Sequence, residues 1–377
     1  MLPQFWDDTH HALAAEAERW VTDHIRPHAE RFEEESPFDV GLYQKAGDAG
    51  LIGVAYPEDV GGAGGDIFHA LIVVEALVRG HSVGTAVGLG SHAIAVPPIL
   101  ALGTEEQKAR LAAPVIAGAK IGALAITEPG AGSDVAGVRT RAVRDGDHYV
   151  VDGSKTFITS GVRADILTTL VRTGEDRHGG LTMLVIEKGT PGFTVGRPLK
   201  KMGWWASDTA ELHFEGCRVP VANRLGEEGS GFLGVMSNFV HERLVLAATC
   251  VAIARLALEQ TERYVTEREA FGRPIGSFQV LRHTLAEMRT REAQARAFTS
   301  VVAERHRRGS DVTVDVAMAK NAAVDACSFV TDRAVQLHGG MGYMRECLVE
   351  RLYRDARLFP IGGGTTEIMR ELISKWR

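Results

Sequence analysis

Two glycine-containing segments carry hydroxyl side chains where a loop could bind a ligand. In the first, a short apolar run is followed by Thr127-Glu-Pro-Gly-Ala-Gly-Ser-Asp134. Its proline and glycines predict a tight loop after a buried strand, with backbone N–H groups exposed beside the hydroxyls of Thr127 and Ser133. Such donors can bind the carbonyls of a flat heterocycle or a phosphate, although an ordinary glycine-rich β-turn has the same composition. The second segment, Gly153-Ser-Lys-Thr-Phe-Ile-Thr-Ser-Gly161, repeats the combination.

Composition and charge exclude several classes of function. The chain has 377 residues, 45% of them hydrophobic, which is typical of a soluble protein of two or three domains. The net charge is −6 and the densest basic cluster is Arg305 to Arg308, so nucleic acid is a poor candidate partner. We see no secretory signal and no uninterrupted apolar run of about 18 residues, so we expect a cytoplasmic protein without a membrane span. The cysteines are scattered without a CxxC pair, which predicts buried thiols and no metal site: Cys217, Cys250, Cys327 and Cys347.

The residue pattern changes twice along the chain, which predicts helices, then strands, then helices. Apolar residues recur at helical intervals up to about residue 119 and again from Gly231 onward, whereas short alternating runs separated by turn residues lie between them. We therefore expect domains at residues 1–119, 120–224 and 225–377. The expected helices are Val40–Leu51, His69–Arg79, Gly84–Leu102, a helix capped by Thr104, Leu244–Glu269, Phe278–Arg307, Val314–Gly339 and Ile368–Trp376. The expected strands are His148–Val151, Thr156–Thr159, Asp165–Val171, Leu181–Glu187 and Ala210–Phe214.

Five motifs in this order resemble those of the acyl-CoA dehydrogenases. They are Thr127-Glu-Pro-Gly-Ala-Gly-Ser-Asp134, Lys155-Thr-Phe-Ile-Thr159, Arg268-Glu-Ala-Phe-Gly272, Gln336-Leu-His-Gly-Gly-Met-Gly-Tyr343 and Ile361-Gly-Gly-Gly-Thr-Thr-Glu367. The resemblance implies an α+β fold with an N-terminal helical domain, a middle β-barrel or sandwich domain and a C-terminal four-helix bundle. It also implies FAD, a homotetramer, and oxidation of an acyl-CoA thioester to the trans-2-enoyl-CoA.

The resemblance assigns cofactor contacts residue by residue. Thr127 would bond the pyrimidine edge of the flavin, Ser133 the pyrophosphate side and Thr159 the flavin N5, with Phe157 packed on the ring. The remaining contacts would grip the FAD diphosphate and adenine, partly from a neighbouring subunit, or lie near the cofactor: Arg268, Phe271, Gln336, Gly339, Gly340 and Thr365. For Phe157 and Phe271, plain core packing is the alternative.

The family chemistry requires a base, and its position here departs from the commoner pattern. The α-proton of a thioester is weakly acidic, so a desolvated carboxylate must remove it while hydrogen bonds stabilise the carbonyl oxygen. Many relatives carry the glutamate at the position that is Gly363 here. Isovaleryl-CoA and long-chain relatives place it on the central helix before an arginine, which Glu242-Arg243 matches. We therefore expect Glu242 as base, Arg243 as a nearby charge, the N–H of Gly363 as a carbonyl donor, and room at Gly362 and Gly363 for a bulky acyl group.

We expect electron transfer to an electron-transfer flavoprotein. Two alternatives stay open: an oxidase or monooxygenase relative, and a non-catalytic subunit of a mixed complex. Nothing in the sequence decides between coenzyme A and an acyl carrier protein as the acyl carrier. Trp205 stands where relatives often carry a basic residue, which leaves the coenzyme A contacts of this region open.

Overall fold

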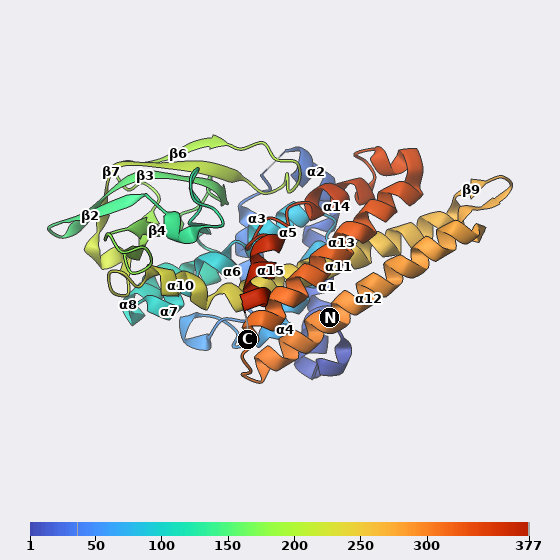
Figure 1. The fold of residues 1–377 in the computed structure, drawn as a ribbon, viewed down its shortest axis with the longest axis horizontal. Helices are drawn as coiled ribbons and strands as arrows, with labels where there is room; N and C mark the ends of the chain where they lie inside the picture. The colour runs from blue at the N-terminus through green and yellow to red at the C-terminus, as the bar shows by residue number, and fades with distance from the viewer. Residues whose placement is uncertain (36, 376–377) are drawn as a thin grey trace.

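The computed structural model describes residues 1–35 and 37–375. Helices come first, then a sheet, then helices, as the sequence predicts (Figure 1). The sheet occupies one end of the molecule, and the long C-terminal helices extend away from it towards the other end.

The N-terminal region consists of short helices. They are α1 (Asp8–His24), α2 (Ala29–Glu34), α3 (Gly41–Asp48), α4 (Ile67–Val78), α5 (Val83–Gly90), α6 (His92–Ala95), α7 (Pro97–Leu102), α8 (Glu105–Gln107) and α9 (Ala113–Ile116). The prediction of one helix over Gly84–Leu102 was wrong, because α5, α6 and α7 divide this stretch. Pro97 opens α7, where a missing N–H is tolerated. The predicted cap at Thr104 is confirmed, since its hydroxyl accepts a hydrogen bond from the N–H of Gln107 (3.2 Å).

The middle region is a mixed sheet with strand order β6-β7-β3-β2-β4-β5-β8, and β1 pairs in parallel with β4. Its strands are β1 (Gly122–Ala125), β2 (Arg141–Asp145), β3 (His148–Thr159), β4 (Ile166–Arg172), β5 (Leu181–Glu187), β6 (Phe193–Pro198), β7 (Thr209–Pro220) and β8 (Arg224–Leu225). Two strands expected separately are one long strand, β3, whose pairing with β7 shifts register twice. The exposed strand β6 was missed because it contains a glycine and a proline, residues that are depleted in strands.

Long helices dominate the C-terminal region. It contains α10 (Gly231–Ser237), α11 (Phe239–Glu267), α12 (Gln279–Arg307), α13 (Thr313–His338), α14 (Leu348–Ala356) and α15 (Thr366–Lys375), with a small hairpin of β9 (Glu269–Ala270) and β10 (Arg273–Pro274) between α11 and α12. Helix α11 is central, as expected, and packs on α13, α12 and α4. It begins at Phe239 instead of Leu244, which places Glu242 in its first turn. Trp376, in the last predicted helix, lies outside the described residues.

One hydrophobic core joins the two helical regions. Phe68 and Leu71 of α4 belong to the same buried cluster as Leu244 and Val251 of α11 and Val316 of α13. Two stretches in the described chain, Val83–Leu102 and Gly231–Glu267, are long and apolar enough to cross a membrane, but 56% and 72% of their most apolar windows are buried inside the protein. Buried core helices pass the same test of length and composition.

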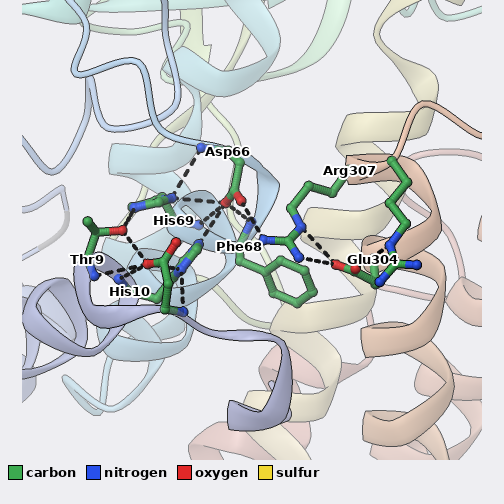
Figure 2. Close-up of polar contacts among 9 residues, drawn as sticks. Thr9, His10, Asp66, Phe68, His69, Glu304 and Arg307 are labelled. Atoms are coloured by element: carbon green, nitrogen blue, oxygen red, sulfur yellow. Dashed lines mark hydrogen bonds and ion pairs between the residues drawn. The ribbon is translucent and has the colours of Figure 1, made fainter.

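A polar network fixes α1 against α4 and α12 (Figure 2). Asp66 caps α4, and its Oδ1 lies 2.9 Å from Nε2 of His10 and 2.9 Å from Nδ1 of His69. Arg307 of α12 reaches the other oxygen of Asp66 at 3.5 Å. The ligand atoms of His10, Asp66 and His69 lie within 4.8 Å of one another, close enough to share a cation. However, all four ring nitrogens already have hydrogen-bond partners, which include Asp7 and Thr9.

Candidate active site

The first two motifs are physically joined. The N–H of Thr156 donates to the carbonyl oxygen of Thr127 at 2.9 Å. The fully buried ammonium of Lys155 lies 2.8 Å from Oε1 of Glu128 and 2.9 Å from the carbonyl oxygen of Ile126. Burial lowers the pKa of Lys155 to about 8, and Glu128 opposes this effect. The buried ion pair therefore holds the two segments together, a role that the sequence analysis did not assign to Lys155.

The surface of this pair of segments presents the predicted flavin contacts. Phe157 has a left-handed backbone (φ +60°) and a ring that is 68% exposed. An aromatic residue rarely adopts this strained and solvated state, so the site suits a flat ligand that would cover the ring. Thr127 and Thr159 are half-buried, and Ser133 is exposed at the end of the loop. The hydroxyls and the aromatic face fit the isoalloxazine ring and phosphate of FAD.

The predicted base, Glu242, lies beside the glycine loop of residues 362–364. A Cβ atom placed on Gly363 would lie 3.4 Å from Oε1 of Glu242. It would also lie 2.2 Å from Cδ1 of Leu246, so Leu246 would have to move before any side chain could fit. The two alternative positions for the base thus lie close together, and of these two Glu242 carries a carboxylate and Gly363 does not.

The surroundings of Glu242 suit proton abstraction. Burial raises the pKa of its carboxyl group, and the charges of Arg243 and Lys320 partly offset the effect. A carboxylate with a raised pKa is a stronger base at neutral pH. In the part of the chain that the structure describes, the N–H of Gly363 donates no hydrogen bond, so it is free to bind a ligand.

Arg243 and Thr365 flank this centre. The buried guanidinium of Arg243 lies 4.5 Å from the ring centroid of Phe239, and within the described residues its Nε has no hydrogen-bond partner. Thr365, directly after the glycines, accepts a hydrogen bond from the N–H of Ile368 at 3.2 Å. Lys320, which the sequence analysis missed, donates to the carbonyl oxygen of Gly362 at 2.6 Å. A single lysine on an otherwise alanine- and valine-rich helix was the signal that could have found it.

An apolar cavity of about 100 Å³ lies between the N-terminal helices and α11. Its walls come from α3, α4, α5, α6 and the first turns of α11, and include Leu89, Ala93, His241 and Val245. His241 and Val245, one helical turn apart, line the cavity, whereas Glu242 does not, so the cavity lies against a neighbouring face of the same helix.

The two tryptophans that could have filled the space at the glycines lie elsewhere. Trp204 donates its backbone N–H and its indole N–H to Asp355, at 2.6 and 3.1 Å. Trp205 lies between the guanidinium groups of Arg345 and Arg354, at 4.3 and 3.8 Å from its ring. The nearest side chains to a Cβ on Gly363 are those of Leu246 and Glu242 instead.

The remaining cofactor candidates are remote from this site in one chain. Arg268 and Phe271 belong to the hairpin around β9, which projects at the far end from the sheet (Figure 1). Phe271 is 94% exposed with φ +54°. Gln336, Gly339 and Gly340 are exposed at the end of α13, near the end of α11, where Tyr264 stacks on His338 with ring centroids 4.2 Å apart. A single chain therefore does not bring them to Thr127 and Thr159.

Comparisons with known proteins agree along the whole chain. Sequence models of the acyl-CoA dehydrogenase N-terminal, middle and C-terminal domains match residues 7–119, 123–217 and 229–377. The long-chain specific acyl-CoA dehydrogenase of pig (Sus scrofa) mitochondria is 38% identical over 99% of this chain and 87% of its own length.

Solved structures give the same match. A probable acyl-CoA dehydrogenase from Mycobacterium abscessus is 48% identical, with a TM-score of 0.97 over 98% of this chain and 99% of that one. An acyl-CoA dehydrogenase from Bacillus anthracis, solved in complex with FAD, is 30% identical, with a TM-score of 0.92 over 99% of this chain and 67% of that one.

Proposed function

Because the chain belongs to the acyl-CoA dehydrogenase family and is an FAD-dependent oxidoreductase, we propose that Glu242 is the base of its reaction. The observation that carries this proposal is the approach of the Glu242 carboxylate to Gly363, the only other position at which the motifs allow a base.

In this proposal, each residue of the site has its own role in the reaction. The N–H of Gly363 binds the thioester carbonyl and stabilises the charge that develops on its oxygen. Glu242 takes the α-proton as the β-hydrogen leaves with its electron pair, and a double bond forms between the two carbons. Bound FAD supplies the two-electron acceptor. Thr127, Thr159 and Phe157 would hold the flavin ring so that the β-carbon is fixed at reacting distance.

Glu242→Gln tests this assignment, because the amide has nearly the same shape but cannot accept the proton. We expect the variant to retain FAD and to lose flavin reduction by about 10²–10⁴-fold in anaerobic stopped-flow bleaching with a panel of acyl-CoA thioesters. Glu367→Gln is the matched control, since Glu367 is the exposed carboxylate closest in sequence to the glycine loop. Wild-type reduction by Glu242→Gln, or loss in Glu367→Gln alone, would reject Glu242 as base.

The proposed electron acceptor is an electron-transfer flavoprotein. In support, a chain in the structure described as the electron transferring flavoprotein of Acidaminococcus fermentans is 36% identical to this one. The proposed location is the cytoplasm and the proposed assembly is a homotetramer, with Arg268, Phe271 and Gln336 completing a neighbouring subunit's site.

A flavin oxidase acting on a carrier-protein thioester is the second candidate. It is favoured by one observation, namely that the prolyl acyl carrier protein oxidase AnaB is 31% identical with a TM-score of 0.90. Oxygen consumption by the substrate-reduced enzyme separates the two functions. A dehydrogenase that passes electrons to a flavoprotein reoxidises slowly in air, whereas an oxidase turns over with oxygen alone.

A further inference from the structure

Lys320 is a buried cation whose recorded acceptors are main-chain oxygens. It lies on α13 and is 1% exposed. Its ammonium group donates to the carbonyl oxygen of Gly362 at 2.6 Å and to that of Gly364. Lysine is rarely buried, because desolvation of the ammonium group is costly. A methionine would fill the same volume without that cost, so the charge and the two hydrogen bonds need an explanation.

The two acceptor carbonyls belong to the residues on either side of Gly363, whose N–H is the proposed donor to the thioester carbonyl. Gly362 C=O and Gly363 N–H belong to the same peptide, and in a trans peptide these two groups point in opposite directions. Fixing the carbonyl of Gly362 on Lys320 therefore turns the N–H of Gly363 away from Lys320. Gly363 and Gly364 both have positive φ, +64° and +90°, so the segment is built from residues that could adopt many other conformations.

Lys320 is also close to the charges of the site. Burial lowers its pKa to about 8, Glu242 favours its charged form, and Arg243 opposes it. Its two main-chain carbonyl acceptors suit an ammonium group, which has three N–H donors. Lys320 stabilises the negative charge of Glu242 through a desolvated interior. It would likewise stabilise negative charge on a bound carbonyl oxygen.

We propose that Lys320 is a positioning residue for the reaction: it clamps the Gly362–Gly364 loop so that the N–H of Gly363 faces the thioester carbonyl, and its charge stabilises the enolate formed there. This rests on the proposed function, in which Gly363 supplies that N–H. Three consecutive glycines leave the loop flexible, and the two hydrogen bonds from Lys320 restrict its conformation. Lys320 itself touches neither the substrate nor the cofactor.

The test separates positioning from folding by using a ligand that enolises without being oxidised. Acetoacetyl-CoA has an acidic α-proton, and its enolate is visible by absorbance when bound to holoenzyme. We expect Lys320→Met to keep FAD, to raise the pH at which the bound ligand enolises by at least about one unit, and to slow flavin reduction about 10²-fold, as loss of an oxyanion donor does. Lys320→Arg keeps the charge and should restore most of the enolisation.

Lys201 offers a matched control. Its ammonium binds the carbonyl oxygen of Ser207 at 2.7 Å and two hydroxyls, and burial lowers its pKa to about 8 as well. Lys201→Met should lower the melting temperature without moving the enolisation pH. If Lys320→Met behaves like Lys201→Met, Lys320 has only a structural role and the proposal is wrong.

The experiment also has an outcome for a Lys320 variant that does not fold and for a failure of the proposed function. If Lys320→Met gives no soluble holoenzyme, the same titration on Lys320→Gln carries the test, and an unshifted enolisation pH overturns the proposal. If the wild-type enzyme does not promote enolisation and Glu242→Gln is active, the proposed function itself has failed. If the wild-type enzyme enolises the ligand and the Lys320 variant does so at the same pH, only the proposed role of Lys320 is rejected.

Discussion

At the scale of residues, the space beside Gly363 can be reached by a carboxylate base from either of two positions in the chain. Glu242 reaches it from α11, and a side chain at Gly363 would reach it from the loop, only 3.4 Å away from that carboxylate oxygen. Leu246 blocks the second route, because its Cδ1 would lie 2.2 Å from the added Cβ. The motifs predict Glu242 as the base, and this assignment stays a prediction. They could not predict Lys320, because its role depends on a contact between α13 and a loop 42 residues further along the chain.

The space beside Gly362, where an added Cβ would meet nothing closer than 3.7 Å, predicts a preference for branched acyl groups. Neither tryptophan fills it, because the N–H of Trp204 binds Asp355 and the indole N–H of Trp205 binds Lys201. One methyl group in a fitted pocket is worth about 1–3 kcal/mol. We expect isovaleryl- or citronellyl-CoA to exceed butyryl- and octanoyl-CoA by at least about tenfold in kcat/KM.

A mild substitution checks whether that space is responsible. A Cβ on Gly362 meets nothing closer than the carbonyl oxygen of Leu358 at 3.7 Å, so Gly362→Ala should fold normally. It should reduce the preference for the branched substrate while leaving the straight chains less affected. A clear lead for either straight chain in the wild-type enzyme contradicts the idea.

At the scale of elements, long periodic segments were predictable and their ends were not. Helix α12 and strand β5 match the expected ranges within one residue. The start of α11 was missed because Phe239 to Arg243 follow α10 without a proline or glycine to mark a boundary. Strands β2 and β6 were missed because their side chains are mostly exposed and do not alternate clearly.

The network around Asp66 predicts a pH dependence of stability. Burial opposes ionisation of Asp66, but hydrogen bonds from His10 and His69 outweigh it and lower its pKa to about 2. A lowered folded-state pKa stabilises the fold above the unfolded value of 3.8, and this contribution is lost as the pH falls from about 4 to about 2. Asp66→Asn should therefore cost about 2 kcal/mol at pH 7.

Thermal unfolding of holoenzyme over a pH series measures this effect. We expect Asp66→Asn to melt a few degrees below wild type at neutral pH and the difference to shrink below about pH 4. Asp59→Asn, which changes an exposed carboxylate in the short 3-10 helix Glu58–Val60 before Asp66, is the control and should match wild type. Equal melting temperatures for Asp66→Asn and Asp59→Asn would show that the network contributes little.

At the scale of the whole molecule, the candidate cofactor residues lie at two opposite ends of one chain, as a site shared between subunits would require. The flavin-facing residues lie by the sheet, whereas Arg268, Phe271 and Gln336 lie at the opposite end of the helices. The same end exposes large apolar side chains, including Phe271 at 94% and Tyr343 at 79%. Exposed apolar surface of this kind usually marks an interface. The sequence indicated this arrangement only through family resemblance, since no pattern within one chain shows which surfaces meet.

Arg268→Ala tests the shared site. A guanidinium group suits bidentate binding of a diphosphate, and hydrogen bonds to charged groups contribute about 1.5–3 kcal/mol. We therefore expect the variant to bind FAD about 10–100-fold more weakly and to dissociate from tetramers at higher protein concentration than wild type, with both effects appearing together. FAD absorbance after gel filtration and sedimentation velocity measure them on one sample.

Arg273→Ala is the control, because Arg273 lies on the same hairpin but contacts Phe278, 4.3 Å from its ring, within its own chain. Full FAD occupancy in tetrameric Arg268→Ala would remove Arg268 from the cofactor site. Loss of FAD without any change in assembly would mean instead that Arg268 serves its own chain, which its distance from the sheet argues against.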